Sequence, residues 1–240
     1  MNQCSSNQID QARRTDHGDA LKALNASTLE ELRQRKVSSL PRAPLFMIGS
    51  VEFQYGHGNI TDAPCDAIVN AANETLEGGG GVDHMIHLKA GEQLRKRCKE
   101  TFPAVPVTRR GGALNVGDHA RCQVGDAVVT PAFDIRPARF VIHTVAPLLD
   151  KDGQPQPDLL AMCYTSCLDA AQKSGATSVA FSSLGTGFYG YPQVAAAEVS
   201  LRATTDWVKK HPETCVKKIL FVTWGPEPTE IYQLCFELFE

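Results

Sequence analysis

Five short apolar runs alternate with amphipathic stretches over most of this chain, and this alternation limits the fold more than any other feature. The runs lie at residues 67–69, 127–130, 140–142, 179–181 and 219–222. Continuous apolar strands are typical of a sheet that is covered on both faces. Apolar residues also recur at helical spacing, first at Ile86, Ala90, Leu94 and Cys98, then over 160–171 and 231–238. We therefore predict an α/β fold, a three-layer α/β/α sandwich.

The N-terminal part of the chain differs from the rest. Residues 1–27 are polar and mixed in charge, which is typical of a flexible arm. Residues 28–31 read Thr-Leu-Glu-Glu, a capping box that predicts a short helix ahead of the main body. We expect one domain over 28–240, with this helix as an N-terminal extension.

The net charge and the cysteine content limit the partners and the compartment that we expect. A net charge of -3 gives no basic surface for duplex nucleic acid. Eight dispersed cysteines without a Cys-x-x-Cys pair indicate free thiols in a reducing compartment, and no apolar stretch is long enough for a membrane helix. We expect the cytoplasm or the nucleus. A mitochondrial location stays open, although the acidic residues of the arm are unusual in a leader.

Several residues are of metal-ligating types, but we expect no metal. Cys163 and Cys167 lie at helical spacing within an apolar stripe, which favours buried thiols over a zinc site. His84 and His87 are three residues apart on a predicted helix, without an apparent third ligand. His143 lies within an apolar strand and is expected to be a hydrogen-bonded core histidine.

Four successive glycines, Gly78 to Gly81, follow the strand that ends near Asn70 and precede a helix that we expect to begin around His84. Glycine is costly in conformational entropy, so this position must require close approach of the backbone. A flexible linker is not expected between a buried strand and a helix. Backbone N–H groups beside a helix N-terminus favour anions, so we predict that this loop binds a phosphate.

A second glycine-rich loop, residues 182–192, again joins a strand to a helix. Gly185, Gly187 and Gly190 formally match the dinucleotide fingerprint of dehydrogenases, but that fingerprint belongs to an early βαβ unit and this loop lies late in the chain. The sequence contains no P-loop signature, and neither glycine loop contains Lys or Arg. We expect the backbone dipoles of both loops to bind two adjacent phosphates.

Six motifs occur along the chain in a fixed order. They are GNIT at 58–61, IVNAAN at 68–73, GGGGVD at 78–83 followed by Ile86-His87, GDA at 125–127, IHTV at 142–145 and GFYGYP at 187–192. Their order and spacing resemble the MacroD-type subgroup of the macrodomain family. The likeness covers about residues 28–240.

This resemblance implies a mixed central sheet of six or seven strands in a monomer that binds ADP-ribose at the strand ends, without a cofactor. Enzymes of the subgroup hydrolyse O-acetyl-ADP-ribose and release mono-ADP-ribose from acidic side chains of modified proteins. By position, Asn59, Ile60 and Trp224 would contact the adenine, and Asn73 and Asp83 would act at the distal ribose. The pyrophosphate would lie against Gly78, Gly79, Gly80, Gly81 and Val82 of the first loop and Ser183, Gly185, Thr186, Gly187, Phe188 and Tyr189 of the second. We expect Tyr189 to cover the distal ribose and Phe188 to turn inward.

Some positions depart from the family pattern. Asn59 stands where most macrodomains have Asp, and its oxygen can still accept a hydrogen bond from adenine, without charge assistance. Gly185 stands where the subgroup usually has Ser. Ala132 and Ala146 replace glycines that the family often has.

Three functions fit these residues: a hydrolase for ADP-ribosyl esters, a reader module that binds ADP-ribose without cleavage, and an ADP-ribose-1''-phosphate phosphatase. The fold alone does not distinguish them. We favour the hydrolase because Asn73 and Asp83 are both present, whereas a reader needs only the loops. Asp83 would orient a water and accept part of its proton, and Asn73 would fix the ribose hydroxyls. For Asp83 the alternative is a helix N-cap.

Overall fold

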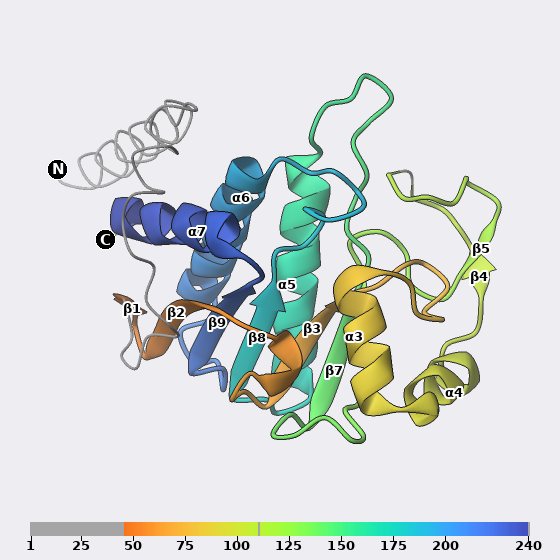
Figure 1. The fold of residues 1–240 in the computed structure, drawn as a ribbon, viewed down its shortest axis with the longest axis horizontal. Coiled ribbons are helices and arrows are strands. Elements are labelled where there is room, and N and C mark those ends of the chain that lie inside the picture. Colours follow the sequence, from red (N-terminus) through yellow and green to blue (C-terminus); the bar gives the residue numbers. More distant parts are fainter. Residues whose placement is uncertain (1–45, 110, 240) are drawn as a thin grey trace, which may run out of the picture.

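The computed structural model describes residues 46–109 and 111–239, so the predicted arm and the helix expected at Thr28 lie outside the described residues. Seven strands form one sheet in the order β1-β2-β9-β8-β3-β7-β6 (Figure 1). They are β1 (Phe46–Ile48), β2 (Val51–His57), β3 (Ala67–Ala71), β6 (Ala127–Pro131), β7 (Phe140–Thr144), β8 (Ser178–Ser182) and β9 (Lys218–Thr223). A separate antiparallel pair consists of β4 (Val105–Pro106) and β5 (His119–Ala120).

Helices cover both faces of this sheet, which confirms the predicted α/β/α sandwich. The helices are η1 (Ile60–Asp62), α3 (Gly81–Ala90), α4 (Glu92–Thr101), α5 (Pro157–Lys173), α6 (Gln193–Lys210) and α7 (Pro226–Phe239). Val69 and its neighbours on one face pack with α5, α6 and α7, whereas Ile68 faces η1, α3 and α4. Because side chains of a strand alternate between faces, Asn70 lies on the same face as Ile68.

The sheet is mixed, as the resemblance implied. The strands β2, β9, β8, β3 and β7 are parallel to their neighbours in that series, and β1 and β6 are antiparallel edge strands. The carboxyl ends of the parallel strands therefore meet at one edge of the sheet. Ligands of open α/β sheets bind outside this edge. No helix among the described residues has the length and hydropathy needed to cross a membrane.

The first helical stretch differs from the sequence-based expectation. Helix α3 begins at Gly81, three residues before the expected start at His84. The predicted face from Ile86 to Cys98 is buried as expected, but Gly91, with φ +80, separates it into α3 and α4. A φ in this range ends a helix and is easily adopted only by glycine.

Candidate functional site

The residues singled out in the sequence lie at the carboxyl ends of four adjacent parallel strands, β2, β9, β8 and β3 (Figure 1). Asn59 and Ile60 follow β2, and Trp224 follows β9. The second glycine loop follows β8, and Asn73 and the first glycine loop follow β3. Neighbouring strands lie about 4.8 Å apart, so the row spans about 14 Å. The predicted adenine, phosphate and distal ribose contacts thus follow one another along a single edge.

The first glycine loop is shaped by conformation and by close approach. Gly78 and Gly81 have φ +87 and +59, which only glycine adopts easily. A Cβ on Gly79 would lie 3.2 Å from Oδ2 of Asp83 and 3.3 Å from Nδ2 of Asn73, so both side chains lie against the loop. By contrast, a Cβ on Gly80 would have no neighbouring atom within 4 Å in the part of the chain that the structure describes. The loop is therefore packed against polar side chains at Gly79 and open at Gly80.

Asp83 is buried in the first turn of α3, and the N-cap of this helix is Gly80. The alternative of a plain N-cap aspartate is therefore wrong. Oδ1 of Asp83 accepts a hydrogen bond of 2.8 Å from Nδ2 of Asn70, and Oδ2 has no hydrogen-bond partner among the described residues. Burial raises the pKa of Asp83, and the hydrogen bond from Asn70, the nearby His87 and the backbone N–H of Gly79 oppose this rise.

His87 lies one helical turn beyond Asp83 and is buried, whereas His84 is exposed. Its Nε2 is 3.3 Å from Oδ1 of Asp83. Burial lowers the pKa of His87 more than Asp83 raises it, so the ring is neutral near pH 7. On its other side, His87 lines a groove of about 670 Å³ between α3 and α4.

Asn73 is more constrained than the sequence suggested. Its Oδ1 accepts hydrogen bonds from the backbone N–H groups of Thr75 and Leu76 at 3.2 and 3.1 Å and from the Thr75 hydroxyl at 2.8 Å. Nδ2 donates to the carbonyl of Gly78 at 3.3 Å. We expected Asn73 to use both its donor and its acceptor on the ribose. Because its oxygen stabilises a turn, only the amide N–H groups keep this expected role.

The second glycine loop is closed by its own hydrogen bonds. Thr186 donates its hydroxyl to the carbonyl of Ser183 at 2.9 Å, and Gly185 has φ +79. The expectation that Phe188 turns inward is wrong, because its side chain is 99% exposed. It follows Gly187 and packs on no core cluster among the described residues.

Tyr189 is the inward-facing aromatic residue of this loop. It packs against apolar residues on two sides. Burial raises the pKa of Tyr189 to about 12, with further contributions from Glu74 and Asp83. The hydroxyl is therefore neutral, and the ring packs against the core cluster that includes Ala72 and Leu76, which follow β3.

The predicted adenine end combines a short helix with an exposed aromatic ring. Asn59 caps η1, and its Oδ1 accepts the backbone N–H of Thr61 at 3.0 Å. Ile60 is buried beside it. Trp224 is 73% exposed, and its ring centre lies 6.0 Å from that of His57.

Glu74 was not identified from the sequence, although it directly follows Asn73. Its buried carboxylate accepts the backbone N–H groups of Ala113 and Leu114 at 2.6 and 3.1 Å, and its carbonyl accepts that of Arg121 at 2.8 Å. These bonds attach residues 111–122 to the loop after β3. The local sequence does not predict such contacts, because the partners are about forty residues away in the chain.

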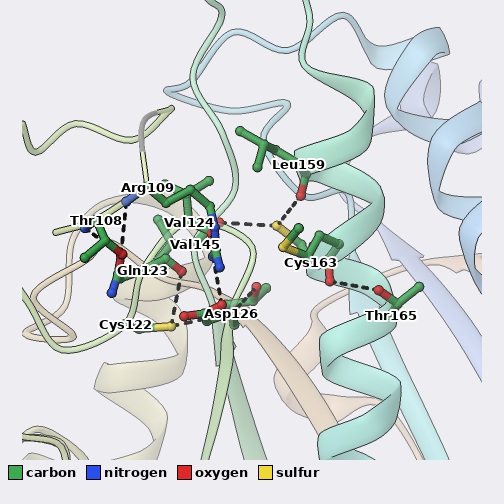
Figure 2. A network of polar contacts seen from close by, with 12 residues as sticks. Thr108, Arg109, Cys122, Gln123, Val124, Asp126, Val145, Leu159, Cys163 and Thr165 are labelled. Atoms are coloured by element: carbon green, nitrogen blue, oxygen red, sulfur yellow. Dashed lines mark hydrogen bonds and ion pairs between the residues drawn. The ribbon is translucent and has the colours of Figure 1, made fainter. Parts of the chain in front are cut away.

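Cys163 and Cys167 are free, buried thiols, as predicted. Figure 2 shows Cys163, whose Sγ donates to the carbonyls of Val145 and Leu159 at 3.2 and 3.3 Å. Burial raises the pKa of Cys163 to about 11. Within residues 46–109 and 111–239, no group of three or more His, Cys, Asp or Glu side chains is arranged to hold a metal ion. In the same view, Arg109 forms an ion pair of 2.8 Å with Asp126.

His143 is the hydrogen-bonded core histidine that the sequence predicted. It lies directly opposite Asn70 in the β3–β7 register. Its Nδ1 is 3.1 Å from Nδ2 of Asn70, and its Nε2 is 3.0 Å from the hydroxyl of Thr130. Complete burial lowers the pKa of His143 to about 3.

Comparisons with known proteins agree with this architecture. The profile of the Macro domain family matches residues 69–200. A Macro domain-containing protein of Listeria monocytogenes is 42% identical over 176 residues, which cover 73% of this chain and 91% of that protein. The chain belongs to the macro domain family. An O-acetyl-ADP-ribose deacetylase of Cronobacter turicensis is 39% identical over 73% of this macrodomain chain and 90% of its own.

Solved macrodomains share the fold. The Oceanobacillus iheyensis macrodomain with ADP has a TM-score of 0.70 and 33% identity, covering 84% of this chain and 98% of that one. The Trypanosoma brucei macrodomain in complex with ADP-ribose has a TM-score of 0.65 and 28% identity, covering 91% and 89%. Other forms of the Oceanobacillus protein replace an asparagine, a glycine and an aspartate, in that order along the chain.

Proposed function

We propose that this macrodomain binds ADP-ribose along the edge formed by β2, β9, β8 and β3 and hydrolyses ester-linked ADP-ribose. The substrates would be O-acetyl-ADP-ribose and mono-ADP-ribose carried on Glu or Asp side chains of proteins. The observation that carries the proposal is the convergence of Asp83 and Asn73 on Gly79, where Oδ2 of Asp83 has no hydrogen-bond partner among the described residues. The names of relatives that are O-acetyl-ADP-ribose deacetylases support the same reaction class.

In the proposed reaction, water attacks the ester and gives up one proton to Oδ2 of Asp83, and Asp83 returns this proton to the leaving oxygen as the ester bond breaks. The products are ADP-ribose with a free hydroxyl and the carboxylic acid, so atoms balance without another reactant. The raised pKa of Asp83 makes its carboxylate a better proton acceptor than an exposed one. The amide of Asn73 would donate to a ribose hydroxyl and hold the reacting carbon near the water.

The experiment is hydrolysis by the purified protein in the presence of a chelator. O-acetyl-ADP-ribose and a peptide modified on Glu should both yield ADP-ribose at rates that the chelator does not change. Binding of ADP-ribose without release from either substrate would instead identify a reader module. Release of phosphate from ADP-ribose-1''-phosphate, with both esters intact, would identify the phosphatase.

Tyr189 is expected to contribute to turnover through its ring. An aromatic face over the distal ribose excludes water and fixes the sugar for attack. Tyr189→Ala should lower the hydrolysis rate about tenfold, and Tyr189→Phe should stay close to wild type. Single-turnover rates of the three proteins provide the measurement. Equal rates for all three would reject this placement of the ring.

Trp224 is expected to stack on the adenine. The chain has two tryptophans, and the other, Trp207, is buried with its Nε1 bonded to Asp169 at 2.7 Å. ADP-ribose should therefore quench the red-shifted emission of Trp224 alone. Trp224→Ala should abolish the quench and weaken binding roughly tenfold, since stacking on a base contributes about 1–3 kcal/mol. Unchanged affinity and unchanged preference for adenine would make Trp224 a structural residue.

A further inference from the structure

Asn70 has no role in the proposed function, although its side chain is hydrogen-bonded to Asp83. Asn70 lies within β3 and is completely buried. Because side chains alternate between the faces of a strand, Asn70 points to the face covered by α3, and the register with β7 places it opposite His143. One side-chain nitrogen, Nδ2, approaches both Oδ1 of Asp83 and Nδ1 of His143, at 2.8 and 3.1 Å.

The chemistry of an amide group fixes the direction of both bonds. The amide nitrogen carries two hydrogens and accepts none, so Oδ1 of Asp83 and Nδ1 of His143 must be acceptors. The reversed amide would place an oxygen 2.8 Å from a carboxylate oxygen, two acceptors face to face. Asn70 is therefore oriented as a double donor.

His143 stabilises this orientation. Its complete burial keeps the ring neutral, so it carries a single ring proton. Because Nδ1 accepts from Asn70, that proton lies on Nε2, which donates to the hydroxyl of Thr130 at 3.0 Å. Thr130, His143 and Asn70 form a buried series of hydrogen bonds that ends on Asp83.

The two carboxylate oxygens of Asp83 therefore have different surroundings. Oδ1 is held by Asn70 from the core, and Oδ2 lies at Gly79 without a hydrogen-bond partner among the described residues. A carboxylate that is anchored through one oxygen can turn less about its side-chain bonds. The free oxygen is thereby aimed at the glycine loop.

We propose that Asn70 is a positioning residue, which fixes Asp83 through Oδ1 so that Oδ2 faces the reacting water; this rests on the proposed function. Asn70 supplies the only side-chain hydrogen bond to Asp83 within residues 46–109 and 111–239. Other groups act on Asp83 through charge or proximity. They are the backbone N–H of Gly79, His87 on α3, Arg95 and Cys98 on α4, His143 on β7 through Asn70, and Tyr189 in the second loop.

The test compares Asn70→Ala with Ser200→Ala. Ser200 is also completely buried and hydrogen-bonded, but it lies on α6 and its bonds are to Tyr232 and Ala197 rather than to Asp83 or Asn70. We expect Asn70→Ala to lower the single-turnover rate about tenfold or more, because a misplaced base loses orientation, while ADP-ribose affinity stays within about threefold. The acid limb of its pH–rate profile should move to higher pH, since the bond that stabilises the carboxylate is gone. Ser200→Ala should change neither the rate nor the profile.

Two further measurements keep the proposal testable. In an Asp83→Ala background, Asn70→Ala should have no additional effect on the rate, because it acts through Asp83. If Asn70→Ala does not fold, Asn70→Val, which suits a strand, replaces it. The carboxyl carbon of Asp83, followed by NMR without substrate, should titrate at higher pH in the Asn70 variant. This signal is independent of hydrolysis, so an inactive wild type would reject the proposed function alone, whereas an unchanged titration and rate profile would overturn the role of Asn70.

Discussion

Gly80→Glu should fold normally and lose ADP-ribose binding by about two orders of magnitude. Apart from its chain neighbours, no atom of residues 46–109 and 111–239 lies within 4 Å of a Cβ at this position, and the backbone has φ -99, which any residue adopts. The new side chain therefore costs little in the free protein. In the complex, its carboxylate would face the pyrophosphate, and such like-charge contacts cost several kcal/mol. Since 1.4 kcal/mol corresponds to tenfold in affinity, calorimetry should detect the loss easily.

Gly80→Gln is the matched control, because it has the same length without the charge. We expect it to retain substantially more affinity than Gly80→Glu. One structure of the Oceanobacillus macrodomain contains ADPR although a glycine is replaced by valine, so a neutral side chain can be tolerated in that relative. Undiminished affinity in Gly80→Glu, with the protein folded, would remove the phosphate site from this loop.

Five strands were predictable from the sequence because they are covered by helices on both faces. Each apolar run falls within β3, β6, β7, β8 or β9. Strand β2 was missed, since Glu52, Gln54 and His57 interrupt its apolar residues. A continuous-run criterion cannot detect such a strand, although alternation of Val51 and Phe53 with polar residues gave a weak signal of period two.

The position of the candidate site was also predictable, but its internal contacts were not. Glycine-rich loops after buried strands indicate where phosphates bind, because the requirement is for backbone geometry. The bond from Asn70 to Asp83 depends on where α3 crosses β3, which is set by packing across the whole sheet. The direction of Phe188 was predicted wrongly because the local sequence does not reveal which of the adjacent residues Phe188 and Tyr189 packs against the core.

Asp83→Asn should lower the rate of hydrolysis strongly without lowering the stability of the fold. The amide keeps the shape of the carboxylate but cannot accept a proton as a base, so hydrolysis should fall by about 100-fold or more. ADP-ribose affinity should change only a few-fold, because in the proposed complex the loops bind the pyrophosphate. Single-turnover hydrolysis and calorimetry on the same preparations provide both numbers. Asp83→Ala should show the same loss of rate.

The stability of Asp83→Asn has an expected sign. Because the pKa of Asp83 is raised in the folded protein, the ionised carboxylate destabilises the fold above that pKa, and the fold gains from this group only at lower pH. At pH 7 the neutral amide should therefore melt at the same temperature as wild type or higher, and no cap is lost, since Gly80 caps α3. If Asp83 is a buried base, the variant should be slower and at least as stable as wild type. If Asp83 were only structural, the variant should be less stable. Hydrolysis at near wild-type rate in Asp83→Asn would leave the glycine loops as a binding site and place the chemistry on other residues.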